Sequence, residues 1–206
     1  MATGRAETGR RKERSAETEQ ALKDAARRLF AERGYLNTKI TDITAAAGRA
    51  AGSFYNHFAS KEELLQALLA DFAAQGDTAA ERESHNPDFT DPDAVRFHVE
   101  NYWTFARRNW PVLRAMNQAA LVNEEFAQRT ARFAVEQRKD IDDHLDGFDA
   151  AGLRLPSSRD ASLAMMFLSL QALLEAVEQG TVRLTDEQAI EGLTRFVYRG
   201  LTGRDY

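Results

Sequence analysis

The sequence predicts an all-α protein of about nine helices. Apolar residues recur at the three- and four-residue spacing of helices along most of the chain, and no stretch of useful length alternates as a strand does. Glycine, proline and capping residues divide the chain into segments of helical length. We expect an arm over residues 1–16, a three-helix domain over residues 17–60 and a helical body over residues 61–206.

The composition favours a soluble protein with a packed interior. Of the 206 residues 43% are hydrophobic, and the absence of cysteine excludes disulfides and thiolate metal sites. The arginine-rich amino terminus lacks the apolar core of a signal peptide. The most apolar run, residues 161–177, is interrupted by Ser162, Ser169, Gln171 and Glu175. We therefore expect a buried helix there rather than a membrane span, and a cytoplasmic protein overall.

Charge is distributed unevenly along the chain, whose net charge is −5. Residues 1–61 hold 12 Lys and Arg against 7 Asp and Glu, whereas residues 62–206 hold 15 against 25. The amino-terminal part is therefore basic and the remainder acidic. This distribution concentrates the attraction for phosphate groups at one end of the chain.

A helix-turn-helix outline lies within residues 38–61. Three apolar residues share one face of its first short helix: Ile40, Ile43 and Ala47. Gly48 follows, where a sharp turn needs a residue that adopts positive φ. A second short helix carries Phe54 and Phe58 on one side. A second helix of this size fits the major groove of DNA.

The segments on either side of this outline carry helical signals of their own. Upstream, an apolar stripe begins at Leu22 and ends before Gly34, and downstream Ser60 and Glu63 form a capping box before a leucine-rich helix. The blocks LFAERGY, Ala47-Gly48, Gly52-Ser53-Phe54-Tyr55, His57-Phe58 and SKEELL occur in this order. Over about residues 17–69 the chain resembles the amino-terminal domain of the TetR family of transcriptional regulators.

The resemblance implies two groups of DNA-binding residues. Phosphate contacts fall on Thr38, Tyr55, His57 and Lys61, whose hydroxyl, phenol, imidazole and ammonium groups suit that role. Base-facing positions fall on Thr41, Ala51, Gly52, Ser53 and Asn56. Asparagine pairs with adenine through two hydrogen bonds, and the methyl groups of Ala and Thr can contact that of thymine. Packing within the domain is the alternative role for the phenol and the imidazole.

The chain departs from the family pattern directly after the turn. Arg49 stands where the family usually has an apolar residue, Ala50 where Ser or Thr caps the recognition helix, and Ala51 where a cationic or long polar residue is usual. Two roles for Arg49 remain open: its stem covers the core with its head in water, or it binds a phosphate or a guanine. The missing cap costs about 1 kcal/mol, so we expect the recognition helix to be firmly ordered only on DNA.

The amino-terminal arm is basic and lacks apolar periodicity, so we expect it to be disordered when free. Its cationic residues are Arg5, Arg10, Arg11, Lys12 and Arg14. Two roles remain open for this arm. It is either a solubilising tail or a segment that reaches along the minor groove or the backbone of DNA.

Capping signals and periodicity place the helices of the body. We expect helices at 61–82 and 92–108, a short one from residue 111, a long one over 126–145, and an eighth and a ninth helix after them. The expected caps are Asp91 with Pro92, Ser157 with Asp160 for the eighth helix, and Thr185 with Gln188 for the ninth.

The eighth helix is apolar nearly all round, so it must be covered on every side. Its large apolar residues are Met165, Met166, Phe167, Leu168, Leu170, Leu173 and Leu174. In a small domain a second subunit can supply part of that cover. The resemblance to the TetR family implies the same arrangement, in which the eighth and ninth helices pair with their copies to form a homodimer.

Large apolar side chains with few polar ones among them are typical of a ligand cavity. The residues expected to line it are Phe72, His98, Asn101, Tyr102, Phe105, Trp110, Met116, Phe126, Phe133 and Met166. An ordinary core is the alternative for any one of them. The family resemblance implies a pocket for a small apolar or amphipathic effector.

Sequence signals of catalysis are absent. The four histidines, at positions 57, 85, 98 and 144, do not have metal-ligand spacing. The chain has neither a nucleophile elbow nor a glycine-rich phosphate loop. We therefore expect no catalytic residue, no metal site and no cofactor.

Together these signals predict a homodimeric regulator that binds a palindromic operator in double-stranded DNA. Repression relieved by a small effector is the expected mode of control. The alternative, which Ala50 and Ala51 keep open, is a helical small-molecule- or partner-binding protein whose helix-turn-helix no longer binds DNA.

Overall fold

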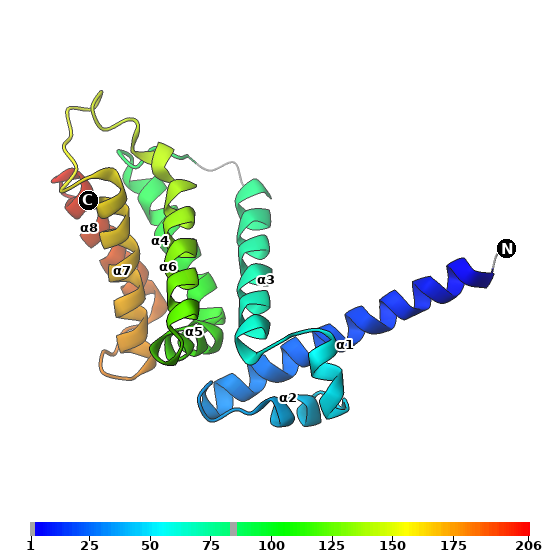
Figure 1. The fold of residues 1–206 in the computed structure, drawn as a ribbon. Coiled ribbons are helices and arrows are strands. Elements are labelled where there is room, and N and C mark those ends of the chain that lie inside the picture. The colour runs from blue at the N-terminus through cyan, green and yellow to red at the C-terminus, as the bar shows by residue number, and fades with distance from the viewer. Residues whose placement is uncertain (1–2, 83–85) are drawn as a thin grey trace. The chain divides into compact units, whose positions relative to one another are not determined.

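The computed structural model describes residues 3–82 and 86–206, and the side chains of residues 10–71 and 86–206. Within these ranges the chain is helical and has no strand, which confirms the all-α prediction (Figure 1). The elements are α1 (Thr3–Arg33), α2 (Ile40–Ala46), the 3-10 helix η1 (Ala51–Asn56), α3 (Lys61–Arg82), α4 (Pro92–Arg108), α5 (Trp110–Val122), α6 (Glu124–Lys139), the 3-10 helix η2 (Asp142–Leu145), α7 (Arg159–Glu178) and α8 (Asp186–Thr202).

The chain divides into two compact units. Unit 1 comprises residues 1–75 and 110–128, and unit 2 comprises residues 76–109 and 129–206. This grouping differs from the predicted boundary at residue 60, because α5 and most of α3 belong with the helix-turn-helix. A boundary drawn from sequence order could not anticipate a helix that rejoins the first unit after α4.

Unit 1 is built on an apolar core shared by α1, α2, η1 and α3. Its buried side chains include Leu22, Ala25, Ala26, Phe30, Tyr35, Ile43, Phe54, Phe58, Leu64, Leu65 and Leu68. The ring centroids of Phe54 and Phe58 lie 5.6 Å apart, as their four-residue spacing predicts. Lys23 and Arg27 of α1 both bind the carboxylate of Asp71 on α3, at 3.1 and 3.2 Å. These contacts fix α3 against α1.

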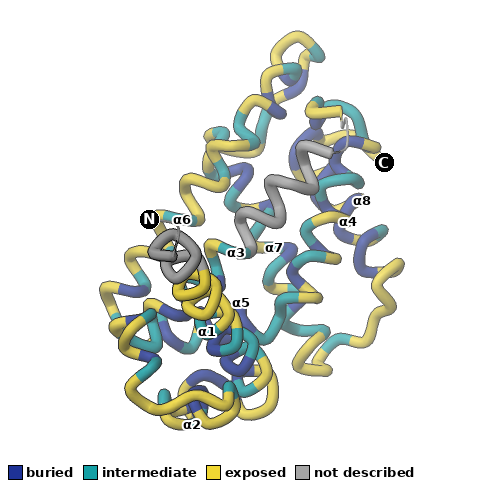
Figure 2. Tube along the Cα trace, turned by 90° about the vertical axis from the view of Figure 1, so that its right-hand side faces the viewer, coloured by how far each residue is buried: buried dark blue, intermediate teal, exposed yellow. Residues whose placement is uncertain are grey.

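The predicted disorder of the amino-terminal arm is wrong, because α1 already begins at Thr3. Residues 10–17 are exposed along this extension (Figure 2). The segment is rich in Ala, Arg and Glu, which have high helix propensity, and it continues a helix already stabilised by packing further along. A helical extension therefore needs no apolar face of its own.

Unit 2 is organised around α4, α7 and α8, which pack on one another (Figure 1). Asp91 accepts a hydrogen bond from the backbone amide of Asp93, and Pro92 occupies the first helical position, as predicted. Thr185 and Gln188 form the predicted capping box of α8. At the opposite end of α4, the indole Nε1 of Trp103 donates to Asp186 at 2.8 Å and joins α4 to α8.

Two predicted boundaries in unit 2 are corrected. The long helix expected over residues 126–145 ends at Lys139, and η2 follows it as a separate turn. The apolar spacing continues through Ile141 and Leu145, so the sequence pattern does not reveal the break. The cap of α7 is Ser158 rather than Ser157, since Ser158 accepts the hydrogen bond from the amide of Ala161.

The length and composition of α7 would allow it to cross a membrane, with a mean hydropathy of 1.4. Only 28% of that window is buried within the chain. One side, including Leu163, Met166 and Leu170, is buried, whereas Met165 and Leu168 are exposed. The helix thus presents an apolar surface that its own chain leaves uncovered.

Candidate nucleic-acid interface

Two glycine turns connect the three helices of the helix-turn-helix. Gly34 ends α1 with a φ of +80°, and Gly48 follows α2 with a φ of +64°, a backbone conformation that other residues rarely adopt. After the second turn the amide of Arg49 donates back to the carbonyl of Thr44 at 2.9 Å. The sharp turn predicted at Gly48 is therefore present.

The second helix of the motif, η1, is a 3-10 helix rather than an α-helix. Ala50 occupies its N-cap position in an extended conformation and supplies no side-chain hydrogen bond. The amide and hydroxyl of Ser53 both donate to the carbonyl of Ala50, at 2.9 and 2.7 Å. The missing cap noted in the sequence thus coincides with a short, tightly wound element.

Most of the predicted DNA-binding residues on α2, the turn and η1 are exposed. These are Thr41, Arg49, Ala51, Gly52, Tyr55 and Asn56, with Ser53 partly exposed. Tyr55 is 63% exposed, although the centroid of its ring lies 5.5 Å from that of the buried Phe54. A large aromatic side chain held in solvent by a buried neighbour is available for a partner.

Lys61 is instead engaged within unit 1. Its ammonium group donates to the carbonyls of Tyr35 and Thr38, at 2.8 Å each, and lies 3.8 Å from the centroid of the Tyr35 ring. Burial lowers the pKa of this ammonium group. An ammonium has three donors, and the two carbonyls use two of them.

Tyr35 and Glu62 complete this cluster. The phenol of Tyr35 donates to the Glu62 carboxylate. Burial, together with this hydrogen bond, raises the pKa of Tyr35 far above its ordinary value. Burial alone would raise the pKa of Glu62, but the hydrogen bonds from Tyr35, from Ser60 and from a backbone amide, with the charge of Lys61, together outweigh burial and lower the pKa. The phenol therefore stays protonated and the carboxylate stays charged.

Thr38 and His57 also have internal partners. Thr38 is 1% exposed, and its hydroxyl donates to the carbonyl of Gly34 at 2.7 Å. It therefore does not cap α2, whose N-cap is Lys39. The side chain of His57 is 10% exposed, and its Nδ1 lies 4.0 Å from the carboxylate of Glu19. The packing role left open for the imidazole of His57 agrees with this burial. Thr38, which was predicted to bind phosphate, is buried and internally hydrogen-bonded instead.

Two cations near this surface did not figure among the predicted residues. Lys39 is exposed at the start of α2, beside Thr38. Arg28 is exposed on α1, and its guanidinium donates to the carbonyl of Ala46 at the end of α2. A signal for Lys39 existed in the sequence, as a basic residue at the start of the first motif helix. The position of Arg28 depends on how α1 and α2 pack.

The residues predicted to bind an effector fall into both units. Trp110, Met116 and Phe126 belong to unit 1, whereas His98, Asn101, Tyr102, Phe105, Phe133 and Met166 belong to unit 2. The side chain of Phe72 lies outside the described side chains. Within unit 2, the ring centroids of Tyr102 and Phe167 lie 5.5 Å apart. Burial raises the pKa of Tyr102 to about 12. Met166 is buried, but Asn101 is exposed rather than enclosed.

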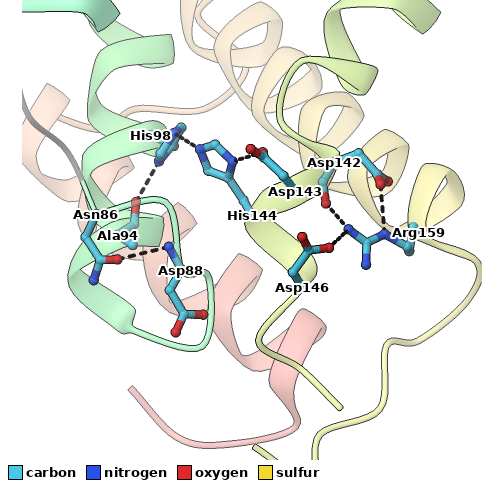
Figure 3. A network of polar contacts seen from close by, with 9 residues as sticks. All are labelled: Asn86, Asp88, Ala94, His98, Asp142, Asp143, His144, Asp146 and Arg159. Atoms are coloured by element: carbon cyan, nitrogen blue, oxygen red, sulfur yellow. Dashed lines mark hydrogen bonds and ion pairs between the residues drawn. The ribbon is translucent and has the colours of Figure 1, made fainter. Parts of the chain in front are cut away.

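His98 takes part in a chain of polar contacts (Figure 3). Its Nδ1 lies 2.8 Å from the carbonyl of Ala94, and its Nε2 lies 3.0 Å from Nε2 of His144. Nδ1 of His144 lies 2.7 Å from Asp143, and this hydrogen bond lowers the pKa of the Asp143 carboxyl. Phe89 contacts both imidazole rings edge-on. The contacts join α4 to η2.

An open groove of about 460 Å³ lies in unit 2. It is lined by Arg107, Val177, Gly180, Val182, Arg183, Leu184, Thr185 and Gln188. None of the predicted effector-binding residues is among them. Arg107 is paired with Glu178 and Asp186 beside this groove.

Comparisons with known proteins agree with the helix-turn-helix. A sequence model described as "Bacterial regulatory proteins, tetR family" matches residues 22–68. The transcriptional regulator TtgR of Pseudomonas putida is 41% identical over 83 residues, which are 40% of this chain and 39% of TtgR. The repressor KstR2 of Mycobacterium tuberculosis is 49% identical over 51 residues, which are 25% of this chain and 26% of KstR2.

A solved structure extends the similarity of fold to both units. FadR from Bacillus subtilis, determined in complex with stearoyl-CoA, superposes with a TM-score of 0.75 at 15% identity and covers 88% of this chain and 98% of its own. Similarity at this identity concerns the fold. The sequence matches cover about two fifths or less of the curated relatives' length and lie at the helix-turn-helix. Residues 22–68 of this chain therefore match the helix-turn-helix domain of the TetR family of transcriptional regulators.

Proposed function

We propose that the protein is a sequence-specific DNA-binding regulator that represses transcription from a palindromic operator. The observation that carries this proposal is the exposed face of α2 and η1 above a buried core. Side chains such as Thr41, Tyr55 and Asn56 are presented to solvent there by residues that the core holds in place. The basic charge of residues 1–61 supports binding to phosphate.

In this proposal base contacts come from Thr41, Ala51, Gly52, Ser53 and Asn56. Phosphate contacts come from Tyr55 and Lys61, with Thr38 and His57 contributing mainly by supporting the fold. Arg49 is exposed beside the turn and has the reach for a phosphate or a guanine. The basic extension of α1 is a further candidate for backbone contacts, because a helix with exposed arginines can follow a phosphate chain.

A homodimer formed through α7 and α8 is part of the proposal. Met165 and Leu168 on α7 and Phe196 on α8 are exposed by 48%, 63% and 67%. A large apolar surface on one subunit is unfavourable in water, and a second copy would cover it. Two copies related by a two-fold axis would also match the symmetry of a palindromic operator.

We further propose that a small apolar or amphipathic effector relieves repression. The solved FadR structure contains stearoyl-CoA, an amphipathic molecule, in a protein of the same fold. Here α3 and α6 each run from one unit into the other, so a ligand that favours one state of unit 2 can bias unit 1. In this proposal the protein catalyses no reaction. It acts in the cytoplasm.

The test is selection of bound sequences from random double-stranded DNA. The proposal predicts enrichment of a palindrome whose half-sites are read with clear base preference. The alternative is a helical ligand- or partner-binding protein without DNA binding, which the uncapped 3-10 helix η1 favours. Selection that enriches no sequence at low salt would support that alternative.

A further inference from the structure

The turn between α1 and α2 is held by a side chain from a distant segment. The backbone amide of Tyr35 donates to Oε1 of Gln118 on α5, at 2.8 Å and 83 residues away in sequence. At a glycine-capped helix end, the amide after the glycine commonly bonds back to a carbonyl of the same helix. Gly34 does bond back, to Phe30 at 3.0 Å, but the amide of Tyr35 is directed to Gln118 instead.

The contact is close on the glycine side as well. A Cβ atom at Gly34 would lie 3.1 Å from Oε1 and 3.4 Å from Nε2 of Gln118. The amide group of Gln118 therefore lies directly against the backbone of the turn. Both partners belong to unit 1, because α5 is part of the same compact unit as α1 and α2.

A second side chain holds the same turn. The ammonium of Lys61 on α3 donates to the carbonyls of Tyr35 and Thr38. Tyr35 thus has its amide bonded to α5 and its carbonyl bonded to α3. With both polar groups of this residue fixed, the direction in which the chain leaves α1 is determined. Two residues after Thr38 the chain enters α2, the helix that carries Thr41.

We infer that Gln118 is a positioning residue for DNA binding. Its side-chain oxygen accepts the hydrogen bond from the amide of Tyr35. Through this bond it sets the turn that places α2 and η1 relative to α1. The inference rests on the proposed function, since it concerns how the same DNA-binding face is oriented. A role limited to stability would lower the folded fraction, but it would leave the number of phosphates contacted by the folded protein unchanged.

Two substitutions separate the acceptor from the rest of the side chain. Gln118→Met keeps the length but removes the strong acceptor, whereas Gln118→Glu keeps an acceptor at the same place. Asn117→Met, at the neighbouring exposed position, is the matched control. Binding to the selected operator is measured at several salt concentrations, and hydrogen exchange of the Tyr35 amide is followed in each protein.

We expect Gln118→Met to weaken operator binding about 3- to 10-fold, the range for one neutral hydrogen bond. Its slope of log affinity against log salt should fall in magnitude by about 0.9 for each phosphate that the variant no longer binds. Exchange of the Tyr35 amide should become faster. Gln118→Glu and Asn117→Met should retain the affinity, slope and amide protection of the unmodified protein.

Equal affinity and salt slope for Gln118→Met and the unmodified protein would overturn this inference and leave the proposed function intact. An unprotected Tyr35 amide in the folded, unmodified protein would overturn it too, even if Gln118→Met failed to fold. Absence of DNA binding by the unmodified protein would instead overturn the proposed function, and this inference with it.

Discussion

At the scale of single residues, the structure separates side chains that face solvent from those that hold the domain together. Asn56 and Tyr55 are exposed, whereas Lys61 and Thr38 donate hydrogen bonds to backbone carbonyls. The sequence predicted which residue types lie in the motif, because their spacing is local. It could not predict that Lys61 binds carbonyls 23 and 26 residues earlier, since such pairs depend on the packing of three helices.

Asn56→Ala should relax base preference at one operator position. An asparagine that forms two hydrogen bonds with adenine contributes about 1–3 kcal/mol of discrimination. Tyr55→Phe should weaken binding to all sequences alike, because a phosphate contact carries no base information. Selection profiles of the two variants check this. A changed base preference in Tyr55→Phe with an unchanged one in Asn56→Ala would reverse the assignment.

The His98–His144 chain has a defined number of protons. The carbonyl of Ala94 and the carboxylate of Asp143 accept at its two ends. Three contacts are involved: Ala94 to His98, His98 to His144, and His144 to Asp143. Each needs one proton on a ring nitrogen to be a hydrogen bond, so the two rings together need three N–H protons. Two neutral imidazoles carry only two. The Asp88 carboxylate lies near Gly147, and the Arg159 guanidinium binds Asp142 and Asp146 of the same region (Figure 3).

We expect nitrogen chemical shifts of labelled histidine to show a hydrogen-bonded proton between the two Nε2 atoms of His98 and His144. Asp143→Asn should then lower stability, because an uncharged amide is a weaker partner for the shared proton. In the unmodified protein the pKa of the Asp143 carboxyl is lowered. Asp143 therefore stabilises the fold at pH values above the ordinary aspartate pKa of about 3.9. This contribution is lost as the pH falls through the lowered pKa. If both rings were neutral, the side-chain amide introduced by Asp143→Asn could donate to His144, and stability would be unchanged or higher.

At the scale of elements, capping signals predicted helix starts better than periodicity predicted helix ends. Pro92 and the Thr185–Gln188 box mark their helices as expected, since each acts through its own backbone neighbours. The end of α6 at Lys139 was not predicted, because the apolar spacing continues across the break. The helical extension of α1 was missed because this segment has no apolar periodicity. A helix can continue without an apolar face once packing stabilises the rest of it.

Ala50→Ser should stabilise the recognition element. Ala50 already has the extended N-cap conformation, with φ −66° and ψ 147°, but lacks a side-chain oxygen. A serine there could accept a hydrogen bond from the amides at the start of η1 and add about 1 kcal/mol to the free energy of unfolding. Urea denaturation measures this change. A variant that is less stable than the unmodified protein would show that η1 is not limited by its missing cap.

At the scale of the whole molecule, binding to a palindromic operator requires two copies of the chain. Leu168→Glu places a charge on the exposed side of α7 and should separate the dimer, because a charge buried without a partner is costly. Leu121→Glu, at a leucine that is 83% exposed on α5, is the matched control and should remain dimeric. Sedimentation velocity distinguishes the two. Leu174, also on α7, is unsuitable for this test, because it is 1% exposed on its own subunit and a charge there would disturb the core.

The proposal as a whole is that a dimer reads a palindrome through two copies of the α2–η1 face. Its most direct test is the affinity of the unmodified protein for the selected palindrome and for a single half-site, each measured over a range of salt concentrations. We predict tight binding to the palindrome, much weaker binding to the half-site, and a log–log salt slope of about −0.9 per phosphate contacted. Equal affinity for the palindrome, the half-site and unrelated DNA at low salt would contradict the account.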